Sequence, residues 1–263
     1  MVVASLSLGA LVGVLLSGGF VWWEVGRYAV PQVPVTLFDE RKELFAYTAG
    51  LFVGVPLALA AILFFLSMAN GALPGALLFL TGLIASTEVA QWALLRTRFW
   101  GRSESGPFYA LGYRAAIGGI IALAIVAQYL GGTGVSAVGV GLILLDAVAV
   151  VALEVAGALL SIRGGPPGSP QRGGPLAGAI FGAFGFFLVG IGPLGGEVTA
   201  LLGALIALGG AGLVYRRLRP MLSSIPAPGG GGPPAGPAAP SAYRRTGGPL
   251  PSSDEANDVP RAR

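Results

Sequence analysis

Four carboxylates lie inside or at the edge of strongly apolar stretches of this chain: Glu88, Asp146, Glu154 and Glu197. Carboxylates in hydrocarbon are costly, and those that occur there commonly mark proton or ion pathways. Gln91 follows Glu88 by three residues, so the two polar groups share one flank of a helix. Glu88, Asp146, Glu154 and Gln91 are therefore candidates for a proton or cation site, whereas Glu197, at the outer start of its stretch, also fits a membrane interface.

Helical geometry allows these acids to meet inside a bundle. Asp146 and Glu154 are separated by about 80° around one helix and ~12 Å along it, so both can face the bundle interior. Glu88 and Glu154 come at similar depths in their stretches. If their helices pack together, two like charges share a buried site, which favours the uptake of a proton or a cation.

Arg114 supports a different interpretation. It comes just inside the apolar stretch that lies between those of Glu88 and Glu154, and it can pair with either carboxylate. Arg163 is a second candidate partner for Glu154. Such an ion pair would orient the helices without transporting anything. The residue types and their spacing leave both interpretations open.

The stretches that carry these residues are long enough to span a membrane. Of 263 residues, 54% are hydrophobic and 11% are charged, whereas a soluble domain has about 25% charged residues. A membrane-spanning helix needs about 20 apolar residues. The sequence therefore predicts an all-α, polytopic transmembrane helix bundle over residues 1–222. Its seven expected spans lie near residues 2–23, 44–67, 73–95, 109–130, 134–162, 175–192 and 196–216.

The positive charges indicate an orientation for these spans. With seven spans, all 16 Lys and Arg residues fall on one side, in alternate connections and in the C-terminal segment. By the positive-inside rule, we expect a multi-pass protein of the cell membrane with its N-terminus outside and its C-terminus in the cytoplasm. A cleaved signal peptide is the competing interpretation of residues 1–23, but these residues lack the positively charged start of such a peptide.

Several local features add detail to the predicted bundle. Asp39 can cap a short helix that leads into the second span, within a charged surface segment that ends at Glu43. Pro56 predicts a kink in the second span, which neighbouring helices can accommodate or a transporter can use as a hinge. Pairs of glycines four residues apart predict close helix packing. These pairs are Gly9 and Gly13, Gly50 and Gly54, Gly71 and Gly75, and Gly178 and Gly182.

Residues 223–263 differ in composition from the rest of the chain. They are dominated by Pro, Gly, Ala and Ser. Such a segment cannot bury enough apolar surface to offset the loss of chain entropy on folding. The sequence therefore predicts a disordered cytoplasmic tail.

The residue types that the chain lacks narrow its function. It has no Cys and no His, which removes thiolate nucleophiles, imidazole bases and the usual zinc and haem ligands. The last expected span also has no Lys for a retinal Schiff base. We therefore expect no catalytic residue, no cofactor and no metal. Because the positive charges report membrane topology, we expect no nucleic-acid partner either.

Three functional hypotheses remain. The first is a proton- or cation-coupled transporter or channel-like protein that uses the buried carboxylates. The alternative is a non-catalytic membrane subunit or scaffold that anchors a partner complex, with a membrane protein or a second copy of the chain as its candidate partner. A membrane-embedded enzyme is the least supported, because the usual catalytic residues are missing. The lipid bilayer is a partner in all three.

Cysteine labelling tests the predicted orientation, since the chain has no cysteine of its own. Gly71→Cys and Gly132→Cys, in two connections without a cation, should react with a membrane-impermeant maleimide outside intact cells. Ser241→Cys, in the tail, should react only after the membrane is permeabilised. Labelling of the two glycine variants from the cytoplasm alone would overturn the orientation.

Overall fold

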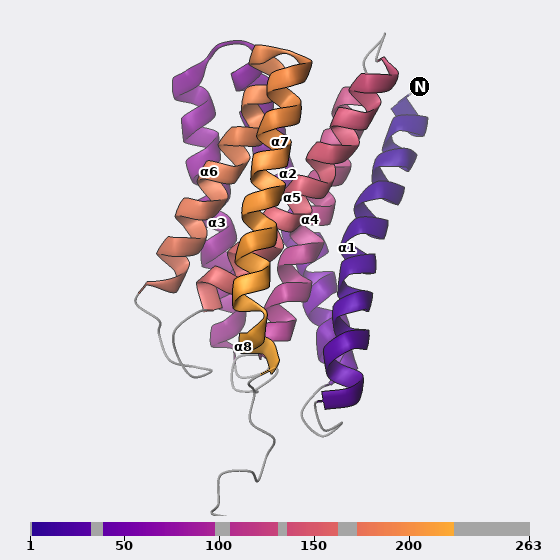
Figure 1. Cartoon of the computed structure of the whole chain (residues 1–263), viewed down its shortest axis with the longest axis vertical. Helices are drawn as coiled ribbons and strands as arrows, with labels where there is room; N and C mark the ends of the chain where they lie inside the picture. The colour runs from indigo at the N-terminus through magenta and orange to yellow at the C-terminus, as the bar shows by residue number, and fades with distance from the viewer. Residues whose placement is uncertain (1, 33–38, 98–105, 131–135, 163–172, 224–263) are drawn as a thin grey trace, which may run out of the picture. The chain divides into compact units, whose positions relative to one another are not determined.

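The computed structural model describes residues 2–32, 39–97, 106–130, 136–162 and 173–223. Within these ranges the secondary structure is helical, and seven helices are long and apolar enough to cross a membrane (Figure 1). The chain is therefore a multi-pass helical membrane protein. The helices are α1 (Val2–Gln32), α2 (Glu40–Ala69), α3 (Leu73–Arg96), α4 (Gly106–Leu130), α5 (Ala137–Ile162), α6 (Gly174–Gly195) and α7 (Glu197–Leu218), followed by the short α8 (Pro220–Ser223).

The expected helix bundle is confirmed, although some boundaries differ from the expected ones. α1 continues to Gln32 instead of ending near residue 23, and α5 begins at Ala137 instead of near residue 134. In α1, helical hydrogen bonding continues past the apolar residues that mark a span, so hydropathy places the end of the helix too early. α5 instead begins only after Ser136, whose Oγ accepts a hydrogen bond from the backbone N–H of Gly139 at 3.0 Å. The predicted disordered tail and the connections that carry Arg98, Arg102 and Arg163 lie outside the described residues.

The start of α2 differs from the predicted charged surface segment. The Asp39 carboxylate accepts hydrogen bonds from the backbone N–H groups of Arg41 and Lys42, at 3.0 and 3.4 Å. This confirms Asp39 as an N-cap, but the helix that it caps is α2 itself and not a separate short helix. The Asp39 N–H also donates to the Tyr109 hydroxyl of α4 at 3.2 Å. The first turn of α2 is thereby held against α4, and Glu43 is buried instead of solvated.

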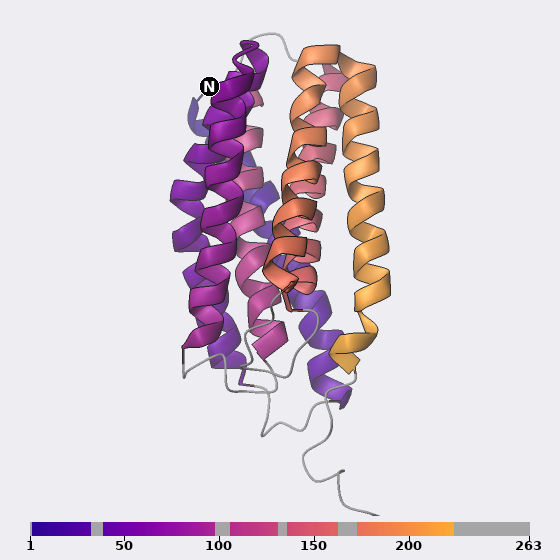
Figure 2. The same ribbon diagram turned by 90° about the vertical axis from the view of Figure 1, so that its left-hand side faces the viewer.

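α4 is the central helix of the bundle. When the most apolar 18-residue stretch of each helix is compared, 83% of that stretch is buried in α4, but only 17% in α1 and 22% in α7. α4 packs against α1, α2 and α5, while α5 packs against α6 and α7. α3 lies against α2 and α6, and the two views show α1 and α7 at the periphery (Figures 1 and 2). A polar side chain on α4 therefore has to find its partners inside the protein.

Glycines allow the close approach of α1 and α2 to α4. A Cβ added at Gly9, Gly13 or Gly50 would collide with the backbone of α4, and one at Gly54 would press on an α4 side chain. These two pairs therefore pack inside the chain, as small residues do between membrane helices. Gly71 differs, because it has open space around it and a φ of 69° in the turn between α2 and α3.

Pro56 lies inside α2 on an exposed face. Its ring is therefore turned away from the helix contacts that Gly50 and Gly54 make with α4. The kink predicted from Pro56 stays a prediction.

The described positive charges, apart from Arg114, lie near helix ends at one end of the bundle. α1, α3, α5 and α7 end there, and α2, α4 and α6 begin there, because successive helices alternate in direction (Figure 1). We call this the α8 end. The prediction that it faces the cytoplasm remains a prediction. The charges whose side chains are described there are Arg41, Lys42, Arg96, Arg216, Arg217 and Arg219.

A pair of glycine substitutions tests the close packing of α2 on α4. Gly50→Ala should lower the free energy of unfolding by about 1–3 kcal/mol, because overpacking forces the helices apart. Gly82→Ala is the matched control, since Gly82 has nothing within 4 Å of its added Cβ. Thermal unfolding in detergent measures both. A Tm for Gly50→Ala no lower than that for Gly82→Ala would contradict this packing.

Candidate functional site

Glu88 lies on the buried face of α3. Residues of that face recur at three- and four-residue spacing, as in an amphipathic helix. Because the apolar side chains of this face pack inside the bundle, Glu88 and its neighbour Gln91 are buried with them. Glu88 is 8% exposed. The face consists of Ala76, Leu80, Leu83, Ile84, Thr87, Glu88, Gln91 and Leu94.

Arg114 of α4 reaches carboxylates on two other helices. Its Nη1 donates to Oε1 of Glu88 at 3.2 Å, and its Nε lies 2.7 Å from Oε2 of Glu154 on α5. Arg114 is 2% exposed and Glu154 is 1% exposed. α3, α4 and α5 thus meet in one buried ion cluster, Glu88–Arg114–Glu154, which we call the Arg114 triad.

The two contacts of Arg114 differ in quality. The contact with Glu88 has hydrogen-bond geometry. The contact with Glu154 has the distance of an ion pair, yet neither Arg114 Nε nor a Glu154 oxygen makes a well-directed hydrogen bond within the described part of the chain. Arg114 is therefore hydrogen-bonded to Glu88, while Glu154 holds it through charge.

The triad contains one carboxylate more than it has guanidinium groups. With all three groups ionised its formal charge is negative. An uncompensated charge in a protein interior costs several kcal/mol, or ~20 kcal/mol in an idealised medium of low dielectric constant. Neutrality of the triad therefore requires one bound proton or one monovalent cation.

Three glycines make room for the side chains of the triad. A Cβ at Gly157 of α5 would lie 2.7 Å from Nη2 of Arg114, and one at Gly178 of α6 would lie 3.0 Å from Oε1 of Glu88. A Cβ at Gly118 would lie 3.2 Å from the Cβ of Glu154. Of the three, only Gly178 belonged to a glycine pair singled out in the sequence.

Ser161 is a site residue that the sequence analysis missed. Its Oγ donates to Oε2 of Glu88 at 2.7 Å and lies 2.9 Å from the carbonyl oxygen of Gly157. A signal was present, because Ser161 follows Glu154 by seven residues and so lies two turns further along the same helix face.

Gln91 is buried beside Glu88, as the shared flank predicted. It is 2% exposed, and neither its amide oxygen nor its amide nitrogen has a hydrogen-bond partner within the described part of the chain. An unsatisfied buried amide group costs about 1–3 kcal/mol. This position therefore suits a water molecule or a polar ligand.

The other two acids singled out in the sequence do not join the triad. Asp146 is only partly buried, and its place on α5, eight residues before Glu154, separates the two by ~12 Å along the helix axis. Glu197 is exposed in the first turn of α7, where a carboxylate is favourable for the helix dipole.

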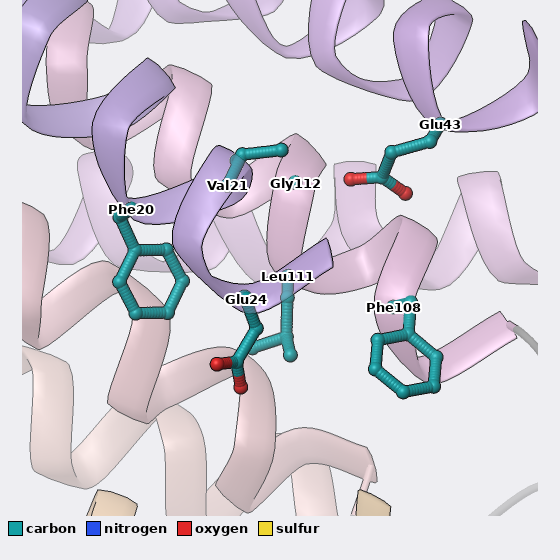
Figure 3. A pocket seen from close by; sticks show the side chains of 7 residues that line it. All are labelled: Phe20, Val21, Glu24, Glu43, Phe108, Leu111 and Gly112. Carbon is teal, nitrogen blue, oxygen red and sulfur yellow. The ribbon is translucent and has the colours of Figure 1, made fainter. Parts of the chain in front are cut away.

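Two further carboxylates lie on the α1 and α2 side of α4. Glu24 and Glu43 line a narrow pocket in which Glu43 is directed toward Gly112, whereas the Glu24 carboxylate lies nearer Phe20 (Figure 3). Both oxygens of Glu24 accept from the Tyr215 hydroxyl at 2.8 Å. Oε1 of Glu43 occupies the space that a side chain at Gly112 would need, and its Oε2 has no partner within the described residues.

The sequence did not indicate these two buried carboxylates, because Glu24 follows the expected first span and Glu43 was assigned to the surface. The signal for Glu43 was its spacing from the glycines of α2. Glu43, Ala46, Gly50 and Gly54 follow one another at three- or four-residue intervals, which continues the face that packs on α4.

The fold and the Arg114 triad define a polytopic helical membrane protein with a polar cluster near one end of its bundle. No protein-family model, no curated protein and no solved structure matches this chain.

Removal of Arg114 tests whether the triad holds the bundle together. Arg114→Met should destabilise the protein by about 3–5 kcal/mol, because two buried carboxylates lose their shared partner. The triple variant Glu88→Gln/Arg114→Met/Glu154→Gln should recover part of this loss. Arg96→Met, at the exposed end of α3, is the control. Chemical denaturation in mixed micelles measures the differences, and an Arg114→Met variant as stable as Arg96→Met would refute the structural role.

Proposed function

We propose that the protein is a proton- or cation-coupled transporter or channel-like protein, with the Arg114 triad as its ion-exchange site. The observation that carries the proposal is the additional carboxylate. A purely structural pair needs one acid for one guanidinium, whereas here Glu88 and Glu154 share Arg114 and all three are buried. Ionisable groups inside membrane bundles are expensive and mark ion or proton pathways.

Binding and release of an ion at the triad would give the bundle two alternative sets of helix contacts. When Glu88 is ionised, it competes with Glu154 for the guanidinium group of Arg114. When Glu88 takes up a proton, the attraction of Arg114 to Glu154 is left unopposed. The binding state of the site therefore changes whether α4 is held more strongly to α3 or to α5. A shift between two such arrangements is the kind of element on which alternating access depends.

The scaffold alternative has one observation in its favour. α7 is among the least buried helices, and a Cβ added at Gly209 or Gly212 would have nothing within 4 Å. The backbone of α7 is therefore open to close approach by a helix of another chain. Native mass spectrometry after mild detergent extraction tests this alternative, which requires a co-purifying membrane protein or a second copy.

Flux measurements in proteoliposomes test the proposed function. Glu88→Gln and Glu154→Gln should abolish proton or cation flux, because each leaves Arg114 with a single carboxylate and so makes the cluster neutral without a bound ion, while nearly preserving its shape. Glu197→Gln, which changes an exposed acid, should leave flux intact. Asp146→Asn shows whether the path extends along α5. Wild-type flux in both triad variants would contradict the proposal.

A further inference from the structure

We infer that the ion exchanged at the Arg114 triad is a proton and that it reaches Glu88 through the hydroxyl of Ser161. This inference rests on the proposed function and specifies its ion and its route. It begins from the contacts of Ser161, a buried residue at the α8 end of α5.

Ser161 has one hydroxyl hydrogen and two acceptors. Its Oγ is 2.7 Å from Oε2 of Glu88 and 2.9 Å from the carbonyl oxygen of Gly157. A serine hydroxyl donates one hydrogen and accepts through two lone pairs. When Glu88 is ionised, the hydrogen points to Oε2. When Glu88 is protonated, the carboxylic acid donates to Oγ, and the Ser161 hydrogen turns to Gly157.

This alternation allows proton relay without net change in Ser161. A hydronium ion beside Ser161 gives a proton to Oγ, while the original hydroxyl hydrogen passes to Oε2 of Glu88. One O–H bond breaks at the hydronium ion and one at Ser161, and one forms at Ser161 and one at Glu88. The products are water, the unchanged serine and a protonated Glu88.

We assign the source of the proton to a water molecule held by Gln91. Its amide oxygen and nitrogen are buried and have no partner within the described part of the chain, and it lies one turn from Glu88 toward the same end of α3. Buried waters typically bridge polar groups that are otherwise unsatisfied. A water bound to Gln91 thus stands on the side of Glu88 that faces the α8 end.

The surroundings of Glu88 favour a proton over a metal cation. Arg114 faces it from α4, Ser161 from α5 and Gly178 from α6 without a side chain, while Glu154 of α5 contacts the same guanidinium group. A metal cation bound to Glu88 would lie beside the fixed guanidinium charge and be repelled by it. A proton instead joins the carboxylate and removes its charge.

Time-resolved infrared spectroscopy of the full-length protein in detergent tests the ion and the route. After a pH jump, the carboxylic-acid carbonyl band that Glu88→Gln removes should appear in the wild type. In Ser161→Ala it should form at least about 10²-fold more slowly, since positioned proton donors and acceptors typically contribute 10²–10⁴-fold. Gln91→Leu, which keeps the hydroxyl, should also slow it, and Ser161→Thr should restore it.

Thr87→Val is the matched control for a lost buried hydroxyl. Thr87 precedes Glu88, and its Oγ donates to the carbonyl oxygen of Leu83 at 2.7 Å. In Thr87→Val, the carboxylic-acid band of Glu88 should form at the same rate as in the wild type. An unchanged rate in Ser161→Ala would show that the proton does not pass through Ser161. A band that responds to sodium at constant pH but not to a pH jump would show that the exchanged ion is not a proton.

The infrared and flux experiments can contradict the proton route and the transport function independently of each other. If flux requires Glu88 but the band forms at wild-type rate in Ser161→Ala, the transport proposal stands and the route is wrong. If the band depends on Ser161 but Glu88→Gln and Glu154→Gln leave flux unchanged, the proton reaches Glu88 as inferred and the transport function is wrong.

Discussion

One guanidinium group shared by two carboxylates constrains the half of this bundle that lies toward the α8 end. Arg114, Glu88 and Glu154 come from three helices, and each is almost fully buried. None of the three can be left alone in an apolar interior, because an isolated buried charge is strongly unfavourable. The triad therefore fixes the rotation and the axial position of α3, α4 and α5 relative to one another. The surplus carboxylate makes the same cluster dependent on what it binds.

Small residues are what make such a cluster compatible with close helix packing. Gly157, Gly118 and Gly178 leave room for the long side chains of the triad, just as Gly13 and Gly50 let α1 and α2 touch the backbone of α4. Large apolar side chains at these positions would push the helices apart. The abundance of glycine in the chain thus serves two purposes, helix contact and accommodation of buried charge.

The sequence predicted the helices better than it predicted the site. Long apolar stretches report spans directly, because hydrocarbon excludes unsatisfied backbone groups. Glu88, Glu154 and Arg114 were singled out for the same reason, since charges are conspicuous among apolar residues. Which carboxylate would meet Arg114 depends on the packing of α3, α4 and α5, and spacing within single helices does not contain that information.

Ser161 and Glu43 show why further polar residues were missed. Ser161 lies near the end of a span, where a hydroxyl attracts no attention until Glu88 of another helix is placed beside it. Glu43 lies in a charged segment, and only the packing of α2 on α4 reveals that it is buried. Spacing along α2 and α5 is consistent with the buried faces on which these two residues lie, but the partners across each contact came from the folded structure.

The position of Arg114 on the most buried helix has a consequence for biogenesis. An arginine inside a membrane helix is costly during insertion by the translocon, by up to about 2.5–3.5 kcal/mol when it lies at the helix centre. α3 leaves the ribosome before α4 and carries Glu88, the residue with which Arg114 makes its hydrogen bond. The chain thus presents the acid before the base, and α4 can enter the bilayer as half of a neutralised helical hairpin. We expect this order of synthesis to lower the cost of inserting the central helix.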